Sequence, residues 1–414
     1  MTSITNLVCE YHSNPLGIDV TAPRLGWQME SDRRGARQTA YRILAASDPL
    51  RLREGQADLW DSGKIETDQS IHIPYAGQKL SSRQRIHWQV TVWDETGQAS
   101  YSDPAWFEMG LLERSDWQGE WIGAALAGGP RTTIPAPFLR QSFQLDGAIK
   151  AARLFVTALG LHACSINGPS VSGDVVAPGG TDYGNRVQYQ GYEVAHLLGE
   201  GVNVIGAILG DGWAVGHIGW HHRQHYFDRP RLLAQLEITM ADGRVITIAT
   251  DQSWKYQFGP LLENDLVMGE AYDARLELPG WDAPGFDGKR WLDVERIDDP
   301  GIDLVATNAP TVRRINRLKP VSDPEDRTTV TTECYIFDLG QNMVGRVRFK
   351  GTAPAGTTVT FRFAEVLNPD GTIYTDNLRT VRVIDYYTFK GDGEEVWEPK
   401  FTFHGFRYVE VSGY

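Results

Sequence analysis

The sequence is poor in the residues that form disulfides, membrane spans and long helices. Its 414 residues include only three cysteines, Cys9, Cys164 and Cys334, which fall in three different predicted modules. Single cysteines so far apart provide neither a disulfide framework nor a paired metal motif. No stretch approaches the roughly 20 apolar residues of a membrane span, and the N-terminus lacks the basic segment and apolar run of a secretion signal. We therefore expect a cytoplasmic protein with reduced thiols and no membrane partner.

Positive charge is also in short supply. The chain carries 40 lysines and arginines against 53 aspartates and glutamates, a formal net charge of −13 that is spread along its length. An acidic surface repels phosphate backbones and anionic lipid, so the composition argues against nucleic acid as a partner. A neutral partner such as a sugar is compatible with this charge.

Glycine and the aromatic residues are plentiful, whereas long runs at helical spacing are missing. The chain has 43 glycines, 21 prolines and 11% aromatic residues. This composition favours many short strands joined by turns, and the length suits two to four domains. We predict an all-β protein of three consecutive antiparallel β-sandwiches.

The first predicted module, residues 1–112, shows the alternation of half-buried strands. In His87–Trp93 a period of two places Trp88, Val90 and Val92 on one face. Such strands are typical of an immunoglobulin or fibronectin type III sandwich. We expect a core of large aromatic side chains: Trp27, Tyr41, Trp60 and Trp88.

Hairpin signals continue through the rest of the chain. Asn167-Gly168 and Asp242-Gly243 stand between apolar runs and predict a jelly-roll sandwich over residues 113–310. Residues 311–414 contain further short apolar runs, with turns at Asn368–Gly371 and Gly391–Gly393, and predict a third sandwich.

Ten distinctive strings are spread over the three modules: Pro23–Trp27, Gln38–Ile43 and Leu59–Gly63; Val187–Tyr192, Leu209–Trp213 and Gly269–Arg275; Phe337–Gly345, Ala364–Gly371, Thr375–Arg379 and Phe403–Tyr408. These strings resemble the multidomain bacterial α-L-rhamnosidases of glycoside hydrolase family seventy-eight. They lie in the family's order and together cover nearly the whole chain. The resemblance implies a fibronectin type III-like domain, a jelly-roll carbohydrate-binding-like domain and a concanavalin-like sandwich. The sequence departs from the family's usual pattern at Gly180, where tryptophan is common, and at Ala214, where an aromatic residue is common.

In the family these domains precede a helical toroid in which catalysis occurs. The Asp-Cys-Pro segment of that toroid is not in the sequence, because none of the three cysteines is followed by proline. The resemblance therefore implies the non-catalytic, N-terminal region of an enzyme that hydrolyses terminal α-L-rhamnosides by inversion. Its partners would be rhamnose-containing glycosides and the helical catalytic domain, joined in cis or carried by a separate chain. Two alternatives stay open: a stand-alone carbohydrate-binding protein, and a self-contained glycosidase that uses carboxylates of this chain.

The self-contained alternative needs two carboxyl groups on opposite sides of a glycosidic bond. Glu270 and Asp273 are the best catalytic candidates, with Arg275 available to bind one of them. Three positions along an extended strand place side chains on opposite faces, which favours a salt bridge or a turn over catalysis.

Sugar and metal contacts are expected mainly in the second module. Trp213 and Trp220 offer flat rings for stacking on a sugar, although Trp213 also suits a core. His221 and His222 belong to a histidine cluster that could form a sugar-facing or domain-facing loop, or hold a transition metal.

The sequence gives no reason to require a cofactor, but it allows a calcium site. Asp182 and Asn185 carry the hard oxygen ligands that calcium prefers, or they stabilise a turn. In the third module we interpret Asn377, Arg379 and His404 as contacts toward the helical domain.

Overall fold

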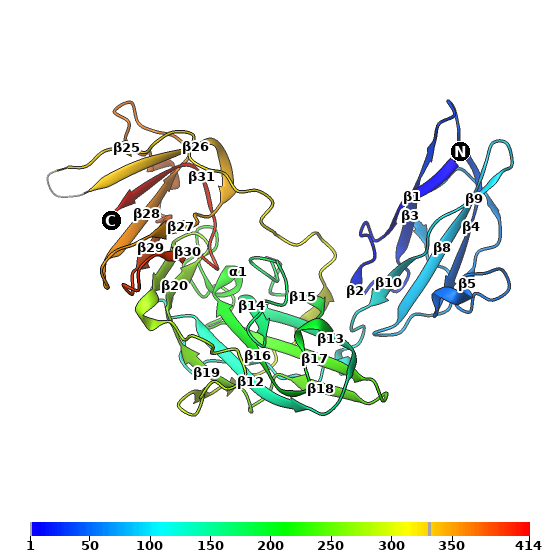
Figure 1. The fold of residues 1–414 in the computed structure, drawn as a ribbon, viewed down its shortest axis with the longest axis horizontal. Coiled ribbons are helices and arrows are strands. Elements are labelled where there is room, and N and C mark those ends of the chain that lie inside the picture. Colours follow the sequence, from blue (N-terminus) through cyan, green and yellow to red (C-terminus); the bar gives the residue numbers. More distant parts are fainter. Residues whose placement is uncertain (1, 330–332) are drawn as a thin grey trace. The chain divides into compact units, whose positions relative to one another are not determined.

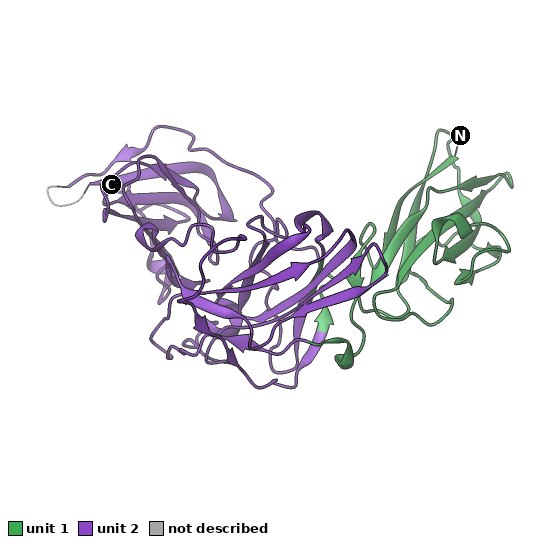
Figure 2. Cartoon of the chain, turned by 60° about the horizontal axis from the view of Figure 1, so that its bottom comes forward, with its two compact units in different colours: residues 1–118, 190–192, 305–309 green, residues 119–189, 193–304, 310–414 purple. Residues whose placement is uncertain are grey.

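β-Strands dominate the computed structural model, which describes residues 2–329 and 333–414 (Figure 1). The single α-helix within these ranges is α1 (Gly212–Val215), and the described residues include no helix with the length and apolarity to cross a membrane. Five short 3₁₀ helices occur at Pro49–Arg51, Arg114–Asp116, Ala195–Leu197, Ala274–Leu276 and Asp376–Leu378. The chain divides into two units (Figure 2): residues 1–118, 190–192 and 305–309, and the remainder. The all-β prediction is confirmed.

Unit 1 is a two-sheet sandwich. One sheet has the order β1-β3-β7 (Thr2–Cys9, Arg24–Ser31, Ile73–Pro74). The other has the order β2-β10-β8-β4-β5 (Leu16–Ile18, Ala105–Met109, Arg85–Asp94, Gln38–Ala46, Trp60–Asp61), with β6 (Ile65–Glu66) on β4 and β9 (Ala99–Tyr101) on β8.

The core of unit 1 contains the aromatic residues expected from the sequence. Trp27, Tyr41 and Trp88 are buried, and Trp60 packs against them half-buried. Val90 and Val92 are buried with Trp88, because alternate residues of β8 face the opposing sheet. The indole N–H of Trp27 donates to Gln38 Oε1 at 2.9 Å, so its polar atom is satisfied inside the core.

Unit 2 begins with two facing sheets, as predicted for the jelly roll. The first has the order β23-β11-β17-β13-β15-β24, with β18 beside β17 (Glu295–Arg296, Ile122–Gly123, Arg231–Met240, Ile149–Leu159, Arg186–Glu193, Asp303–Ala306, Val245–Ala249). The second has the order β14-β16-β12-β19-β22 (Leu161–Ile166, Gly201–Gly210, Pro137–Leu145, Lys255–Phe258, Leu292–Asp293). Asn167 and Gly168 have positive φ values of 55° and 105°, as their turn requires.

The third sandwich takes two strands from an earlier part of the chain. Its large sheet has the order β20-β21-β29-β28-β31-β26-β25 (Leu261–Asp265, Gly269–Asp273, Ile384–Thr388, Thr358–Ala364, His404–Ser412, Cys334–Gly345, Glu325–Asp326), and β27 (Phe349–Gly351) pairs with β30 (Glu395–Trp397). Strands β20 and β21 lie in the range that the sequence assigned to the jelly roll. Strand β21 runs parallel to β29, with Ala271 opposite Tyr386. Sequence alternation does not reveal such a pairing, because its partner lies more than 100 residues away.

The two sandwiches of unit 2 share an apolar cluster. Phe401, from the third sandwich, packs with Phe138 and Ile208 of the jelly roll. Gly210 makes room for it, because a Cβ at this position would lie 2.6 Å from Cγ of Phe401. This contact brings the chain around Phe401 against strand β21.

Candidate functional site

Glu270 lies on β21, where the two sandwiches of unit 2 meet. Its side chain is buried, with 1% of the residue exposed. Its Oε2 accepts hydrogen bonds from the backbone N–H groups of Lys400 at 2.8 Å and Phe401 at 3.0 Å. Its own backbone N–H donates to Asp385 Oδ1 at 2.9 Å. The strand and the Lys400–Phe401 segment therefore hold this carboxylate in one position.

Burial raises the pKa of Glu270 from its ordinary 4.5 to about 7, and the negative charge of Asp385 adds to this effect. The two backbone N–H groups act in the opposite direction because they stabilise the carboxylate. Its Oε1 has no hydrogen-bond partner within residues 2–329 and 333–414. Glu270 is thus a buried acid that titrates near neutral pH with one unoccupied acceptor.

Asp273, the other predicted catalytic carboxylate, has separate partners. It caps the 3₁₀ helix after β21 and binds Arg275, with 2.7 Å between Oδ2 and Nη2. The hydrogen bonds from Arg275 lower the pKa of Asp273. The structure therefore uses Asp273 in the turn and salt bridge expected as the simpler role, and does not bring it together with Glu270.

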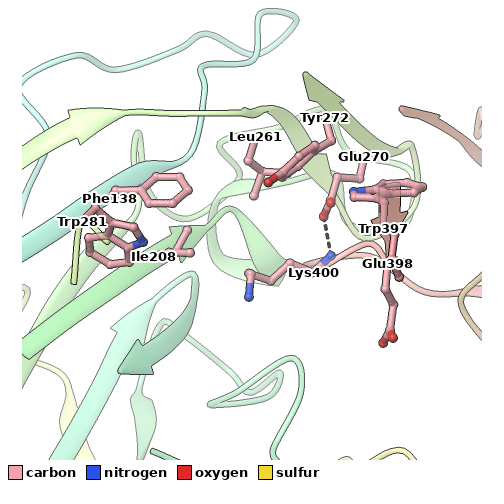
Figure 3. A pocket seen from close by; sticks show the side chains of 10 residues that line it. Phe138, Ile208, Leu261, Glu270, Tyr272, Trp281, Trp397, Glu398 and Lys400 are labelled. Atoms are coloured by element: carbon pink, nitrogen blue, oxygen red, sulfur yellow. Dashed lines mark hydrogen bonds between the residues drawn. The ribbon is translucent and has the colours of Figure 1, made fainter. Parts of the chain in front are cut away.

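A cavity of about 300 Å³ adjoins Glu270 (Figure 3). Most of its wall is aromatic or aliphatic, and it is lined by Phe138, Ile208, Leu261, Glu270, Tyr272, Trp281, Val396, Trp397, Glu398 and Lys400. Strands β12 and β16 of the jelly roll supply Phe138 and Ile208, whereas β30 and the following loop supply the last four residues. Val396 is among the exposed residues of this lining, whereas burial lowers the pKa of the Lys400 ammonium group.

Charged side chains surround the Glu398 edge of this cavity. Glu398 forms ion pairs with Arg314 at 2.9 Å and Arg346 at 3.1 Å. Arg346 also donates to the backbone oxygen of Lys400 at 2.8 Å. These contacts fix the 398–400 segment that supplies one N–H to Glu270. No sequence motif marks Trp397, Glu398 or Lys400, so this part of the site was not predicted from the sequence.

His404 has an interior position, which corrects the expectation that it contacts a helical domain. Only 3% of the residue is exposed, and its Nε2 lies 3.0 Å from Asp385 Oδ1. The same Asp385 oxygen accepts the backbone N–H of Glu270. His404 is therefore part of the interior network that holds β21 against β29.

Trp220 remains on the surface, whereas Trp213 packs inward. Trp220 is 77% exposed, and the guanidinium of Arg379 lies 5.0 Å from its ring centroid. Trp213 lies half-buried in α1 against Gly180, where a Cβ would come within 3.1 Å of the indole. The glycine at position 180 thus leaves space for the Trp213 ring. Nδ2 of Asn377, two residues before Arg379, lies 3.5 Å from Oε2 of Glu365.

A buried ion pair anchors the loop that carries Trp220. Arg223 donates to Asp211 at 2.5 Å, and both side chains are almost completely buried. Burial raises the pKa of Asp211 to about 6, although Arg223 opposes this shift. Asp265 accepts from the backbone and the ring of His217 at 2.9 Å. Burial alone would raise the pKa of Asp265, but these hydrogen bonds lower it.

The histidine and calcium candidates have the following surroundings. His221 stacks on His225 with 4.2 Å between ring centroids, and His222 is exposed. Asp182 accepts from Asn185 Nδ2 at 2.5 Å and from Gly184 N at 3.1 Å, as in a side-chain-stabilised turn. Across residues 2–329 and 333–414, no three His, Cys, Asp or Glu side chains form a group suited to a metal ion. Calcium at Asp182 and Asn185 stays a prediction.

Three family models match the chain in sequence order. Residues 4–113 match a Rha78A-like N-terminal immunoglobulin domain, residues 147–316 an α-L-rhamnosidase N-terminal domain, and residues 328–414 a bacterial α-L-rhamnosidase concanavalin-like domain. Two similar proteins are α-L-rhamnosidases of Streptomyces avermitilis (33% identical, 99% of this chain, 56% of the relative) and Formosa agariphila (39%, 98% and 44%).

Solved structures give the same result. The S. avermitilis α-L-rhamnosidase complexed with L-rhamnose superposes with a TM-score of 0.95 at 32% identity, and covers 100% of this chain and 56% of its own. The enzyme from Dictyoglumus thermophilum gives 0.92 at 34%, with 100% and 47% covered. The chain spans about half the length of these relatives.

Proposed function

We infer that the chain belongs to the bacterial α-L-rhamnosidases and corresponds to their N-terminal region. From this premise we propose that it provides substrate-binding and scaffold modules for an enzyme that hydrolyses terminal α-L-rhamnosides. The observation that supports this proposal most directly is the ordered match of three rhamnosidase domains within about half of the relatives' length. In the complete enzyme, the hydrolytic carboxylates would lie in a helical domain outside the matched region.

The positions of the carboxylates in this chain also support a catalytic site elsewhere in the enzyme. Inversion needs an acid and a base about 6.5–9.5 Å apart with a water between them. Two backbone N–H groups hold one oxygen of Glu270, whereas Asp273 is bound by Arg275 and does not line the cavity beside Glu270. The two carboxyl groups therefore do not flank a shared site, so the geometry disfavours a self-contained glycosidase that uses this pair.

A stand-alone carbohydrate-binding protein is the second candidate function, and the exposure of Trp220 favours it. An exposed indole beside Arg379 offers a flat apolar face and hydrogen-bond donors to a sugar. The two functions differ in whether a helical partner is needed, and not in the use of this surface.

The experiment is a hydrolysis assay of the purified 414-residue chain with p-nitrophenyl α-L-rhamnoside, alongside calorimetric titration with L-rhamnose in calcium and in chelator. We expect no p-nitrophenol release from the chain alone. Turnover that E270Q abolishes would overturn the proposal and establish a self-contained glycosidase. Calcium-dependent binding without turnover would identify a sugar-binding module, and absence of both signals would reduce the role to a scaffold.

A further inference from the structure

Lys400 presents an unpaired amine to the cavity beside Glu270. Its backbone is held on both sides, because its N–H donates to Glu270 Oε2 at 2.8 Å and its carbonyl oxygen accepts from Arg346 Nη1 at 2.8 Å. Its side chain lines the cavity, and in Figure 3 the side-chain nitrogen points away from the Glu270 carboxylate. Within residues 2–329 and 333–414, this amine forms neither an ion pair nor a hydrogen bond. It is therefore free to meet a molecule that enters the cavity.

The surroundings of Lys400 combine accessibility with crowding. The residue is exposed, yet burial lowers the pKa of its ammonium group, against the opposing charge of Glu270 and together with the like charge of Arg346. Both observations hold when a side chain faces a cavity, because its surface is reachable while protein atoms surround it on most sides. At neutral pH a larger share of Lys400 than of an ordinary lysine is the neutral amine, which is the nucleophilic form.

Two other lysines provide a comparison within the same chain. Lys390 pairs with Glu277 at 2.8 Å, and this hydrogen bond raises its pKa. Lys79 is an exposed residue of unit 1. Neither of them lines the cavity beside Glu270. Lys400 differs from both because its unpaired amine lies at a cavity wall.

The walls of the cavity indicate the class of molecule that would reach the amine. Phe138 and Trp281 meet edge to face at 5.1 Å, and Ile208, Leu261 and Tyr272 add further apolar surface. The volume of about 300 Å³ is at the lower end of small-molecule pockets, which suits a single ring or a short aliphatic chain. A polyhydroxylated molecule would leave hydroxyl groups unpaired against these walls, which costs free energy. An apolar body with one electrophilic group is therefore favoured.

We propose that Lys400 is a covalent modification site, at which its amine forms a Schiff base with a small aldehyde that has an aromatic or aliphatic body. The amine nitrogen attacks the carbonyl carbon, so that a C–N bond forms and the π electron pair of the C=O bond moves to oxygen. A proton passes from nitrogen to that oxygen and gives the carbinolamine. Its hydroxyl takes a proton from solvent and leaves as water, and the iminium ion returns one proton to solvent. The net reaction joins one amine to one aldehyde and releases one water, and it does not depend on the proposed function.

The test is reductive alkylation of the full chain with benzaldehyde and cyanoborohydride at neutral pH, followed by mass spectrometry of its peptides. Cyanoborohydride reduces the imine to a secondary amine, so each modified lysine keeps a benzyl group. Short reaction times give a rate for every lysine in one sample of the wild-type chain, so no variant has to fold. We expect Lys400 to react roughly tenfold faster than Lys79, and Lys390 to react more slowly than Lys79.

Glyceraldehyde provides the matched control for the cavity walls, because it is a small aldehyde that carries hydroxyl groups. The ratio of the Lys400 rate to the Lys79 rate should be several times lower with glyceraldehyde than with benzaldehyde, since only the apolar body gains contacts with the walls. A Lys400 rate with benzaldehyde that does not exceed the Lys79 rate would overturn the proposal. Equal ratios for the two aldehydes would refute the part of it that assigns recognition to the apolar walls. Either result leaves the proposed function to its own hydrolysis assay.

Discussion

The backbone N–H of Phe401 donates to Oε2 of Glu270 at 3.0 Å, while the ring of Phe401 packs into the apolar cluster of the jelly roll. One residue of the third sandwich therefore satisfies a buried carboxylate and fills a space left by Gly210. The hydrogen bond and the ring packing of Phe401 together explain why the Glu270 side chain is buried. Its carboxylate fastens the 400–401 segment to strand β21, and the loss of hydration that this position entails raises its pKa.

Replacing Glu270 with glutamine should change how stability depends on pH. The pKa of Glu270 is about 7 in the folded protein and near 4.5 when unfolded, so the folded state binds the proton more tightly. This contribution to stability is complete below pH 4.5 and is lost as pH rises through 7, by roughly 3 kcal/mol in all. E270Q carries no charge, so its unfolding free energy should fall less between pH 5 and pH 8. Urea unfolding at the two pH values measures the difference.

Asp273→Asn is the matched control for that measurement. Arg275 lowers the pKa of Asp273, so Asp273 contributes stability above its unfolded pKa near 4 and loses it only at lower pH. D273N should therefore shift the unfolding curves equally at pH 5 and pH 8. This account of the two carboxylates would be contradicted if the difference in unfolding free energy between D273N and the wild type changed with pH. It would also be contradicted if the difference between E270Q and the wild type did not.

Replacing Arg223 with methionine should destabilise unit 2 strongly. The substitution leaves Asp211 as an unpaired charge in a site where both side chains are buried. We expect the free energy of unfolding to fall by roughly 3–5 kcal/mol, the usual cost of breaking a buried ion pair. The loss should be smaller at pH 5 than at pH 8, because a protonated Asp211 is neutral. The midpoint of thermal unfolding reports it. The double variant R223M with D211N should recover much of the loss, and a double variant as unstable as R223M would show that the arginine acts by other contacts.

Gly269→Ala should prevent the parallel pairing of β21 with β29. Gly269 has a φ of +107°, and an added Cβ would lie 2.0 Å from the backbone oxygen of Ile384. Gly285, with a φ of +88° and open space around it, is the control. G285A should cost about 1 kcal/mol from backbone strain alone, and G269A several times more. Equal losses of unfolding free energy in the two variants would show that the steric contact is unimportant.

The two tryptophans of the predicted sugar surface should separate in their effects on stability. W220A removes an exposed ring and should change the unfolding free energy by less than about 0.5 kcal/mol. W213A removes a ring that packs against Gly180 and should cost roughly 2 kcal/mol. If Trp220 contacts sugar, W220A should also weaken calorimetric binding of a rhamnose-containing oligosaccharide. Unchanged binding in W220A would assign the ring a different role.

Local patterns determined much of the fold in advance. Period-two alternation in His87–Trp93 was enough to place Trp88, Val90 and Val92 in a core, because the pleat of a strand fixes which side chains share a face. The turn at Asn167-Gly168 was predictable for a similar reason, since few residues accept positive φ. The ordered strings then indicated the resemblance to the α-L-rhamnosidases, although they did not assign chemistry to individual side chains.

Tertiary structure alone decided the surroundings of the candidate residues. Glu270 and Asp273 looked equivalent in sequence, but one is held by backbone N–H groups 130 residues away and the other by a neighbouring arginine. His404 lies in a family string that gives no sign of its burial or of its hydrogen bond to Asp385. The cavity combines Phe138 with Trp397, which no periodicity connects. A sequence encodes the faces of its own strands locally, whereas burial, pKa and unpaired polar atoms arise only when distant segments exclude water together.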